Sequence, residues 1–248
     1  MIPKIIHYCW LSNDPLPQKL KKCVNSWKKF LPDYEIERWD LNKFPLEKNI
    51  WVKQAFVKKQ YAFAADYIRL YALYTEGGIY LDSDVEVIKS FNDLLNLPYF
   101  ICKENSPQGI EAAVIGAEKG CGWIKQCLSY YQDKKFIDTK GNMSKKVLPA
   151  ILKEKIEESY SLKFIEHPCD IKFSNSIVYL LPTDFFSPKN YVNKKIHTTS
   201  NTYSIHHFAG TWLPKWKRLM LLVWIPFSAK FPKLSTKIKT LLKNQFSK

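Results

Sequence analysis

The feature that most constrains the fold is a glycine pair, Gly77-Gly78, followed by a short apolar strand that ends in two acidic residues. Glycine takes the left-handed backbone conformation that commonly ends a helix, so the pair marks the end of the helical pattern before it. The strand Ile79–Leu81 is apolar enough to be buried in a sheet. Asp82 and Asp84 therefore lie at the edge of a sheet, where α/β folds tend to bind their ligands.

Asp82 and Asp84 are separated by one residue, so in an extended chain their side chains project to the same face. Two converging carboxylates repel each other unless a cation lies between them, and oxygen ligands of this kind suit Mg²⁺ or Mn²⁺. Such a metal usually keeps open positions for phosphate oxygens, which indicates an enzyme that acts on a nucleotide diphosphate. An isolated Asp-x-Asp is also common in solvated turns, so the interpretation depends on the surrounding sequence.

A second pair of charges lies upstream, in a segment that predicts a helix over residues 60–76. Asp66 and Arg69 are three residues apart and share a face of this helix. Their neighbours are apolar, and buried charges need partners or a ligand. From composition alone, a buried structural ion pair and a ligand-binding pair are equally good interpretations.

The run from Tyr61 to Leu70, followed by Gly77 to Asp84, resembles the glycosyltransferase sugar-binding region containing DXD motif. The resemblance is to family 32 glycosyltransferases, which include yeast Och1-like mannosyltransferases and bacterial capsular polysaccharide enzymes, and more distantly to the clostridial glucosylating toxins. The opening Ile2–Trp10 resembles the first strand of the same family. The segment Ser204–Trp212 resembles its last conserved segment.

The resemblance implies which residues hold the metal. Asp84 would bind Mn²⁺ or Mg²⁺ directly, and Asp82 would help through water or the ribose of the nucleotide. His207 would supply a further ligand from the far end of the sheet. His206 and His207 point to opposite faces of an extended chain, so at most one of them reaches the metal. His207 is favoured because it precedes Phe208-Ala209-Gly210 as the family's ligand does.

The resemblance also implies which residues bind the sugar donor. Asp66 and Arg69 would hold hydroxyls of the donor sugar and act with Asp82 and Asp84 in catalysis. The other implied donor contacts are the Trp10 ring on the nucleotide base, Tyr80 near the phosphates and Trp212 over the diphosphate.

One position departs from the family pattern. Related enzymes commonly carry an amide near the donor sugar in the stretch that corresponds to residues 108–117, whereas the polar residue here is Glu111. We assign Glu111 to the donor site, and its position relative to the reaction centre stays open.

The order of the elements predicts an α/β fold with one catalytic domain over residues 1–212. The resemblance implies the GT-A type, with a Rossmann-like, mostly parallel central sheet flanked by helices. The predicted strands are Lys4–Trp10, Tyr34–Trp39, Ile79–Val87, Tyr99–Lys103, Ala112–Ala117, Ile177–Leu181 and Tyr203–His207. The predicted helices cover residues 18–30, 47–76, 121–132 and 144–158. Six scattered cysteines without paired spacing indicate reduced thiols in a cytosolic setting, and a strand at the start predicts no secretory signal.

The net charge is concentrated near the end of the chain. Residues 185–248 hold twelve Lys or Arg and no Asp or Glu, so they carry 12 of the 15 net positive charges. The apolar run Leu219–Phe227 is shorter than the ~20 residues that span a bilayer. Basic residues around a tryptophan-bearing apolar stretch predict that residues 213–248 form an amphipathic helical extension on an anionic membrane, at the cytoplasmic face of a bacterial cell membrane. The alternative is a helix packed on the catalytic domain.

These observations and the resemblance together predict a metal-dependent glycosyltransferase. It would move a hexose or N-acetylhexosamine from a nucleotide sugar, by family analogy a UDP-sugar, with retention of configuration. The acceptor would be a glycan or a polyprenyl-diphosphate-linked saccharide in the synthesis of capsular polysaccharide or O-antigen. One alternative is a metal-dependent phosphoryl or nucleotidyl transferase. The other is a non-catalytic basic protein that binds lipid or nucleic acid, although the sequence contains no nucleic-acid-binding motif.

Overall fold

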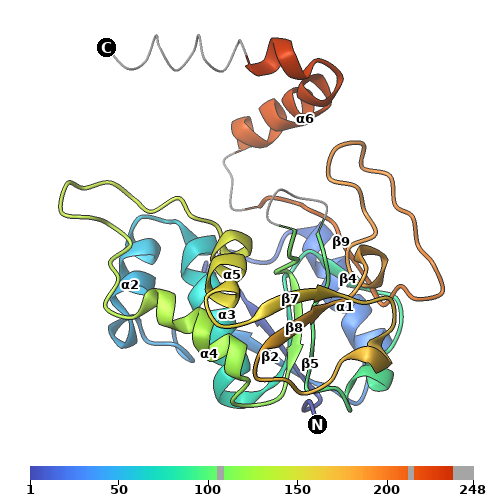
Figure 1. Ribbon diagram of the computed structural model, residues 1–248. Helices are drawn as coiled ribbons and strands as arrows, with labels where there is room; N and C mark the ends of the chain where they lie inside the picture. The colour runs from blue at the N-terminus through green and yellow to red at the C-terminus, as the bar shows by residue number, and fades with distance from the viewer. Residues whose placement is uncertain (105–108, 212–214, 237–248) are drawn as a thin grey trace.

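The computed structural model describes residues 1–104, 109–211 and 215–236 (Figure 1). Its centre is a five-stranded sheet in the order β2-β1-β3-β6-β5. These strands are β1 (Ile5–Cys9), β2 (Glu35–Trp39), β3 (Gly78–Leu81), β5 (Tyr99–Phe100) and β6 (Val114–Ala117). The α/β class expected from the sequence is confirmed.

The sheet differs in one detail from the mostly parallel arrangement that we expected. β2 and β3 both run parallel to β1, whereas β6 is antiparallel to β3 and to β5. The parallel strands are linked through helices, as the alternating pattern required. The described residues between β5 and β6 contain no helix, and the two strands pair antiparallel. The carboxyl ends of β1 and β3 lie side by side, because Ile6 pairs with Ile79 and His7 with Tyr80.

Helices cover both faces of the sheet. α1 (Gln18–Phe30) lies on the face that carries Tyr8, whose ring packs edge-on against Trp27 at 5.5 Å. α3 (Tyr61–Glu76) lies on the opposite face, where its Tyr71 ring packs against Trp39. Trp27 and Trp39 are fully or nearly fully buried, as are five apolar residues of α3, namely Ala64, Ile68, Leu70, Ala72 and Leu73. The core therefore holds α3, and every residue on its inner face, in a fixed position relative to β1 and β3.

Smaller elements complete the body. α2 (Ile50–Val57) and α4 (Gly122–Leu128) pack on α3, and α5 (Leu148–Glu157) packs on α4. Two separate two-stranded sheets pair β4 (Val85–Val87) with β9 (Ser204–His206), and β7 (Ser161–Phe164) with β8 (Ile177–Leu180). The sequence pattern did not predict β7, which is mostly exposed and therefore lacks a buried apolar face.

The glycine pair has the role that its position predicted. The amide of Gly77 donates to Leu73 O at the end of α3, and both glycines have positive φ, 72° and 103°. The imidazole of the buried His7 donates from Nε2 to Gly77 O at 2.7 Å and accepts at Nδ1 from Trp39 Nε1 at 3.0 Å. These contacts fix the point at which the chain leaves α3 and enters β3.

The predicted catalytic domain of residues 1–212 and tail of residues 213–248 stay predictions. Within the tail, α6 (Lys215–Lys230) is a helix, drawn in red and clear of the body in Figure 1. Among the described residues, none of the helices has both the length and the apolar character needed to cross a membrane. Trp212 lies outside the described residues, so the structure does not place its side chain.

Candidate active site

A cavity of about 560 Å³ opens at the carboxyl ends of β1 and β3. It is lined by residues from segments that are far apart in the sequence, and it contains every described residue that we assigned to the donor, together with Asp84, which we assigned to the metal. These are Trp10, Asp66, Arg69, Tyr80, Asp82, Asp84 and Glu111. The expected location at the end of the central strands is therefore the location of the cavity.

Asp82 and Asp84 converge through a turn rather than through an extended strand. The strand predicted over Ile79–Val87 breaks after Leu81, and Val85 N donates to Asp82 O at 2.9 Å to close the turn. One carboxylate oxygen of each acid and a ring nitrogen of His206 all lie within 4.8 Å of one another. The side chains that the motif predicted to converge do so, and a histidine joins them.

The histidine in this cluster is His206, which differs from our expectation of His207. Nε2 of His206 lies 3.6 Å from Asp84 Oδ1, whereas Nε2 of His207 lies 2.8 Å from Glu86 Oε2. The two rings point to opposite sides, as alternation predicted. Val85 pairs with His206, so these two side chains lie on one face of the β4–β9 sheet. If side chains alternated strictly back from β4, Asp84 would lie on the other face, with Glu86 and His207. The turn redirects the Asp84 carboxylate to His206, and this turn could not be seen in the sequence.

The chain after β9 is bent onto the motif. Ala209 N donates to Asp84 Oδ2 at 2.7 Å, and His207 N donates to Asp84 O at 3.1 Å. Phe208 has a φ of 53°, a left-handed conformation that costs a non-glycine residue about 1–2 kcal/mol. Strained backbone of this kind is found most often at functional sites.

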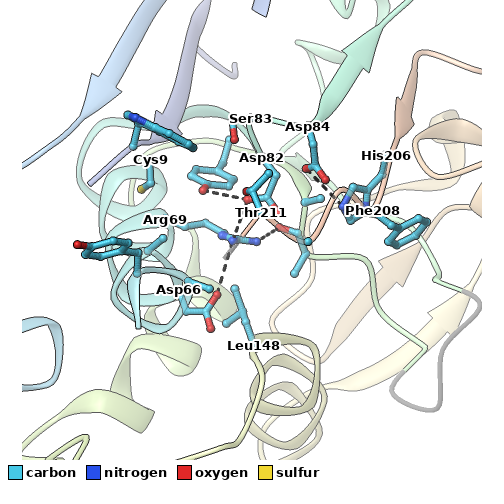
Figure 2. Close-up of a pocket in the computed structure, with 18 of the residues that line it drawn as sticks. Cys9, Asp66, Arg69, Asp82, Ser83, Asp84, Leu148, His206, Phe208 and Thr211 are labelled. Carbon is cyan, nitrogen blue, oxygen red and sulfur yellow. Dashed lines mark hydrogen bonds and ion pairs between the residues drawn. The ribbon is translucent and has the colours of Figure 1, made fainter. Parts of the chain in front are cut away.

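Arg69 is the buried cation of the cavity. Figure 2 shows its guanidinium between Asp66 and Asp82, with Nη2 at 3.6 Å from the first and 3.0 Å from the second. Nη1 donates to Ala112 O, and the Cζ atom lies 4.4 Å above the ring of Tyr80. Within the described residues, Arg69 Nε is buried without a hydrogen-bond partner. Asp66 and Arg69 thus form a buried ion pair that is also part of the cavity wall, and their role in binding a ligand stays a prediction.

Burial and charge set the protonation of the site. Burial raises the pKa of Asp66 to about 7, against the opposing effect of Arg69. Burial also raises the pKa of Asp82. For His206, burial works against the imidazolium, but the Glu111 and Asp84 carboxylates raise its pKa to about 10. For Glu111, the cost of burial is exceeded by the attraction of His206, which lowers its pKa to about 2.

Trp10 and Tyr80 both line the cavity, and their contacts with a donor stay predictions. Trp10 lines one end of the cavity, where its Nε1 donates to Asp14 O at 2.7 Å and fixes the loop after β1. The Tyr80 hydroxyl donates to Asp82 Oδ1 at 3.1 Å. Sequence reasoning missed His206, Phe208 and the α5 residues Leu148 and Pro149, which form other parts of the wall. Apart from the histidine, these residues carry no sequence signal that separates them from ordinary core residues.

Comparison with known proteins relates part of this chain to glycosyltransferases. The model of the family "Glycosyltransferase sugar-binding region containing DXD motif" matches residues 17–101. Inositol phosphoceramide mannosyltransferase 3 of Schizosaccharomyces pombe is 34% identical over 129 residues, 50% of this chain and 36% of that protein. Mannosyl phosphorylinositol ceramide synthase CSH1 of Saccharomyces cerevisiae is 32% identical over 124 residues, 47% of this chain and 32% of that protein.

The chain thus spans about a third of the length of these curated relatives. Among solved structures, the PaToxG glycosyltransferase aligns with a TM-score of 0.49 and 22% identity, over 63% of this chain and 69% of that chain. The family match includes α3, β3 and the acidic motif, which are among the segments that line the cavity. Residues 17–101 of this chain are thus similar to the glycosyltransferase sugar-binding region of the DXD-motif family.

Proposed function

We propose that this protein is a metal-dependent glycosyltransferase that moves a hexose or N-acetylhexosamine from a nucleotide sugar to a glycan or lipid-linked acceptor. The observation that carries the proposal is the meeting of two groups of residues in one cavity. Asp82, Asp84 and His206 gather at one wall, and Asp66 and Arg69 lie beside them. A site for a metal-bound diphosphate next to a site for a sugar is what transfer from a nucleotide sugar requires.

The residues present fit a divalent cation. Two carboxylates and one imidazole, each offering one atom within 4.8 Å of the others, suit Mn²⁺ and, with more water in the shell, Mg²⁺. When bound, the ion would neutralise the charge that grows on the donor diphosphate as the sugar–phosphate bond breaks. Asp84 is the first candidate ligand, because Ala209 N–H and His206 hold its carboxylate in place.

The protein's own part is positioning and charge. Arg69 places a fixed positive charge beside Asp82, and its guanidinium needs no reorganisation because Ala112 and Tyr80 already hold it. Asp66 and Arg69 would hold hydroxyls of the sugar, so that the acceptor hydroxyl reaches the anomeric carbon from a set direction. Leu148 and Phe208 supply apolar wall that limits access of water. We propose that attack occurs on the face that retains the configuration.

Two features support the proposal of a lipid-linked acceptor, namely the basic charge near the end of the chain and the exposed apolar side chains of α6. Trp216, Leu219, Met220 and Val223 are spaced along one side of this helix and are 61%, 65%, 52% and 73% exposed. The tail to which they belong has many basic residues and no acidic one. A helix with exposed apolar residues among basic ones suits the interface of an anionic membrane. We therefore place the protein on the cytoplasmic membrane surface, acting on an acceptor with a phosphate or diphosphate headgroup such as a polyprenyl-linked saccharide.

The names of the curated relatives widen the set of substrates to test. They refer to mannosyl transfer and to inositol phosphoceramide, a lipid with a phosphate headgroup. A GDP-linked mannose therefore belongs in the donor panel beside the UDP-sugars, and phosphoinositol lipids belong among the acceptors.

Donor hydrolysis and thermal protection test the proposal. The full chain is incubated with each nucleotide sugar and Mn²⁺, and the free sugar and the shift of the melting temperature are recorded. One donor should raise the melting temperature only with the metal present and should be slowly hydrolysed, whereas Asp84→Asn should do neither while still melting cooperatively. Equal hydrolysis by the wild type and Asp84→Asn would remove the metal-dependent mechanism. Release of phosphate or nucleotide without free sugar would favour a phosphoryl or nucleotidyl transferase.

A further inference from the structure

Glu111 is a carboxylate buried behind the metal-ligand cluster, with only 1% of the residue exposed. It precedes β6 and is held from two directions. Its amide donates to Cys102 O at 2.9 Å, and its Oε1 accepts from Ala113 N at 2.7 Å. The first hydrogen bond holds the main chain of Glu111 and the second holds its carboxylate, so together they fix the position of the other oxygen, Oε2.

Oε2 of Glu111 meets His206. The distance from Oε2 to Nδ1 of the imidazole is 3.2 Å, and on the other side of the ring Nε2 lies 3.6 Å from Asp84 Oδ1. An imidazole that donates from Nδ1 to a carboxylate presents Nε2 on the opposite side. His206 therefore lies between Glu111 and Asp84, with Nε2 toward Asp84 in the cluster that also contains Asp82.

We propose that Glu111 is a positioning residue that orients His206 as a ligand for the divalent cation. This inference rests on the metal-dependent function proposed above. Carboxylates behind metal-binding histidines fix the ring and its tautomer, and their loss typically weakens metal binding by about 10–100-fold. Both oxygens of Glu111 already have protein partners, so this role differs from the direct donor contact that we expected from the sequence.

The chain offers a matched control one residue away. His207 also pairs with a glutamate, Glu86, at 2.8 Å between Nε2 and Oε2. This second pair is partly exposed and is not part of the cluster that contains Asp82 and Asp84. If loss of any carboxylate partner of a histidine weakened Mn²⁺ binding, variants of both pairs would bind the ion less tightly. If Glu111 positions the metal ligand, only the Glu111 variants would do so.

The experiment measures Mn²⁺ binding by the full chain, without a nucleotide sugar, from the electron paramagnetic resonance signal of the free ion. The variants are Glu111→Gln, Glu111→Ala, His206→Ala and Glu86→Gln. Glutamine keeps the volume but offers one oxygen, so it satisfies either Ala113 or His206 and not both. We expect affinity to fall by about 10–100-fold in both Glu111 variants and to change less than about twofold in Glu86→Gln.

The spin echo of bound Mn²⁺ gives an independent readout. Modulation from a coordinated imidazole nitrogen should be present in the wild type and in Glu86→Gln, absent in His206→Ala, and weakened in Glu111→Gln. If the wild type binds Mn²⁺ and both Glu111 variants bind it equally well, the positioning role is wrong while metal dependence stands. If Glu86→Gln loses as much affinity as Glu111→Gln, His207 is the ligand instead. If the wild type binds no Mn²⁺, both proposals fall. Should Glu111→Ala fail to fold, Glu111→Gln alone decides.

Discussion

Arg69 donates a hydrogen bond to Asp82 over 3.0 Å and so connects the buried helix α3 to the first acid of the motif. The two residues are 13 positions apart in the chain, on opposite sides of the glycine pair. The side chain of Arg69 is only 7% exposed, so this contact lies where water screens little. The position of the motif carboxylate therefore depends on the packing of α3 against the sheet.

Replacing Arg69 by lysine should be far from conservative. Lysine keeps the charge but loses the planar fork that reaches Asp82 and Ala112 together and lies over Tyr80. We expect the free energy of unfolding to fall by about 2–3 kcal/mol, the scale of a lost hydrogen bond to a charged group, and donor hydrolysis to fall with it. Urea unfolding measures the first. Arg38→Lys is the control, because the Arg38 side chain is 43% exposed and its contacts, with Asp40 at 3.7 Å and with Trp10 O at 3.2 Å, are open to solvent; it should change stability by less than about 1 kcal/mol.

Replacing Asp66 by asparagine should stabilise the fold at neutral pH and weaken the enzyme. Burial raises the pKa of Asp66 from 3.8 to about 7, so the folded chain keeps a proton that the unfolded chain releases. Ionisation of Asp66 therefore lowers the stability of the wild type as the pH rises from about 4 to about 7, by up to about 4 kcal/mol, and this one contribution changes no further above that range. Asparagine cannot ionise, so the variant should lack this loss.

Urea unfolding of the wild type and Asp66→Asn at several pH values measures the effect. The difference in free energy between the two should widen from pH 4 to pH 7 in favour of the variant. Its donor hydrolysis should nevertheless be lower, because Asp66 lines the cavity where the sugar is proposed to bind. Stability curves that stay parallel over this range would show that Asp66 ionises normally.

Much of the site could be predicted because it is local in the sequence. Three features follow one another between residues 61 and 82. They are the helix that carries Asp66 and Arg69, the glycine pair, and the apolar strand before Asp82. Each has a pattern of its own, namely helical spacing, left-handed glycine and a short apolar run. Their order then leads α3 directly into β3, the central strand of the sheet, and Arg69 of α3 contacts Asp82 just after β3.

What could not be predicted depends on contacts between distant segments. The choice of His206 over His207 follows from the register of β4 and β9 and from the turn at Asp84. Glu111 could be found in the sequence as an unusual acid in an apolar stretch, but its partner His206 is 95 residues further along. The antiparallel placement of β6 likewise depends on pairing that no local pattern encodes.

The glycine pair gives a test of the fold itself. A Cβ atom at Gly78 would lie 2.7 Å from Ile5 O and 3.0 Å from His7 Nε2, and the φ of 103° is unfavourable for any other residue. Gly78→Ala should therefore cost about 2–4 kcal/mol of stability, from the backbone and from overpacking together. Gly141 also has a positive φ, 82°, but open space around it, so Gly141→Ala should cost only the backbone part, about 1 kcal/mol. Equal losses of melting temperature in the two variants would contradict the close packing around Gly78.

Membrane binding should depend on the exposed side of α6. A triple variant, Trp216→Ser with Leu219→Ser and Val223→Ser, removes three side chains that are each more than 60% exposed. Burying such side chains in an interface contributes up to about 1.5–3 kcal/mol each, so sedimentation with anionic phospholipid vesicles should weaken by at least about tenfold. Binding of the wild type should also fall as salt is added, because the tail is basic.

The control removes comparable apolar residues elsewhere. Ile50 and Val57 on α2 are 42% and 66% exposed, and their change to serine should leave vesicle binding unaltered. If the α6 variant sediments with vesicles as well as the wild type, the exposed side of α6 does not bind the membrane. The proposal of a lipid-linked acceptor then loses its main support. Because donor hydrolysis needs no membrane, the α6 variant should keep it. That result would separate attachment to the bilayer from the chemistry of the cavity.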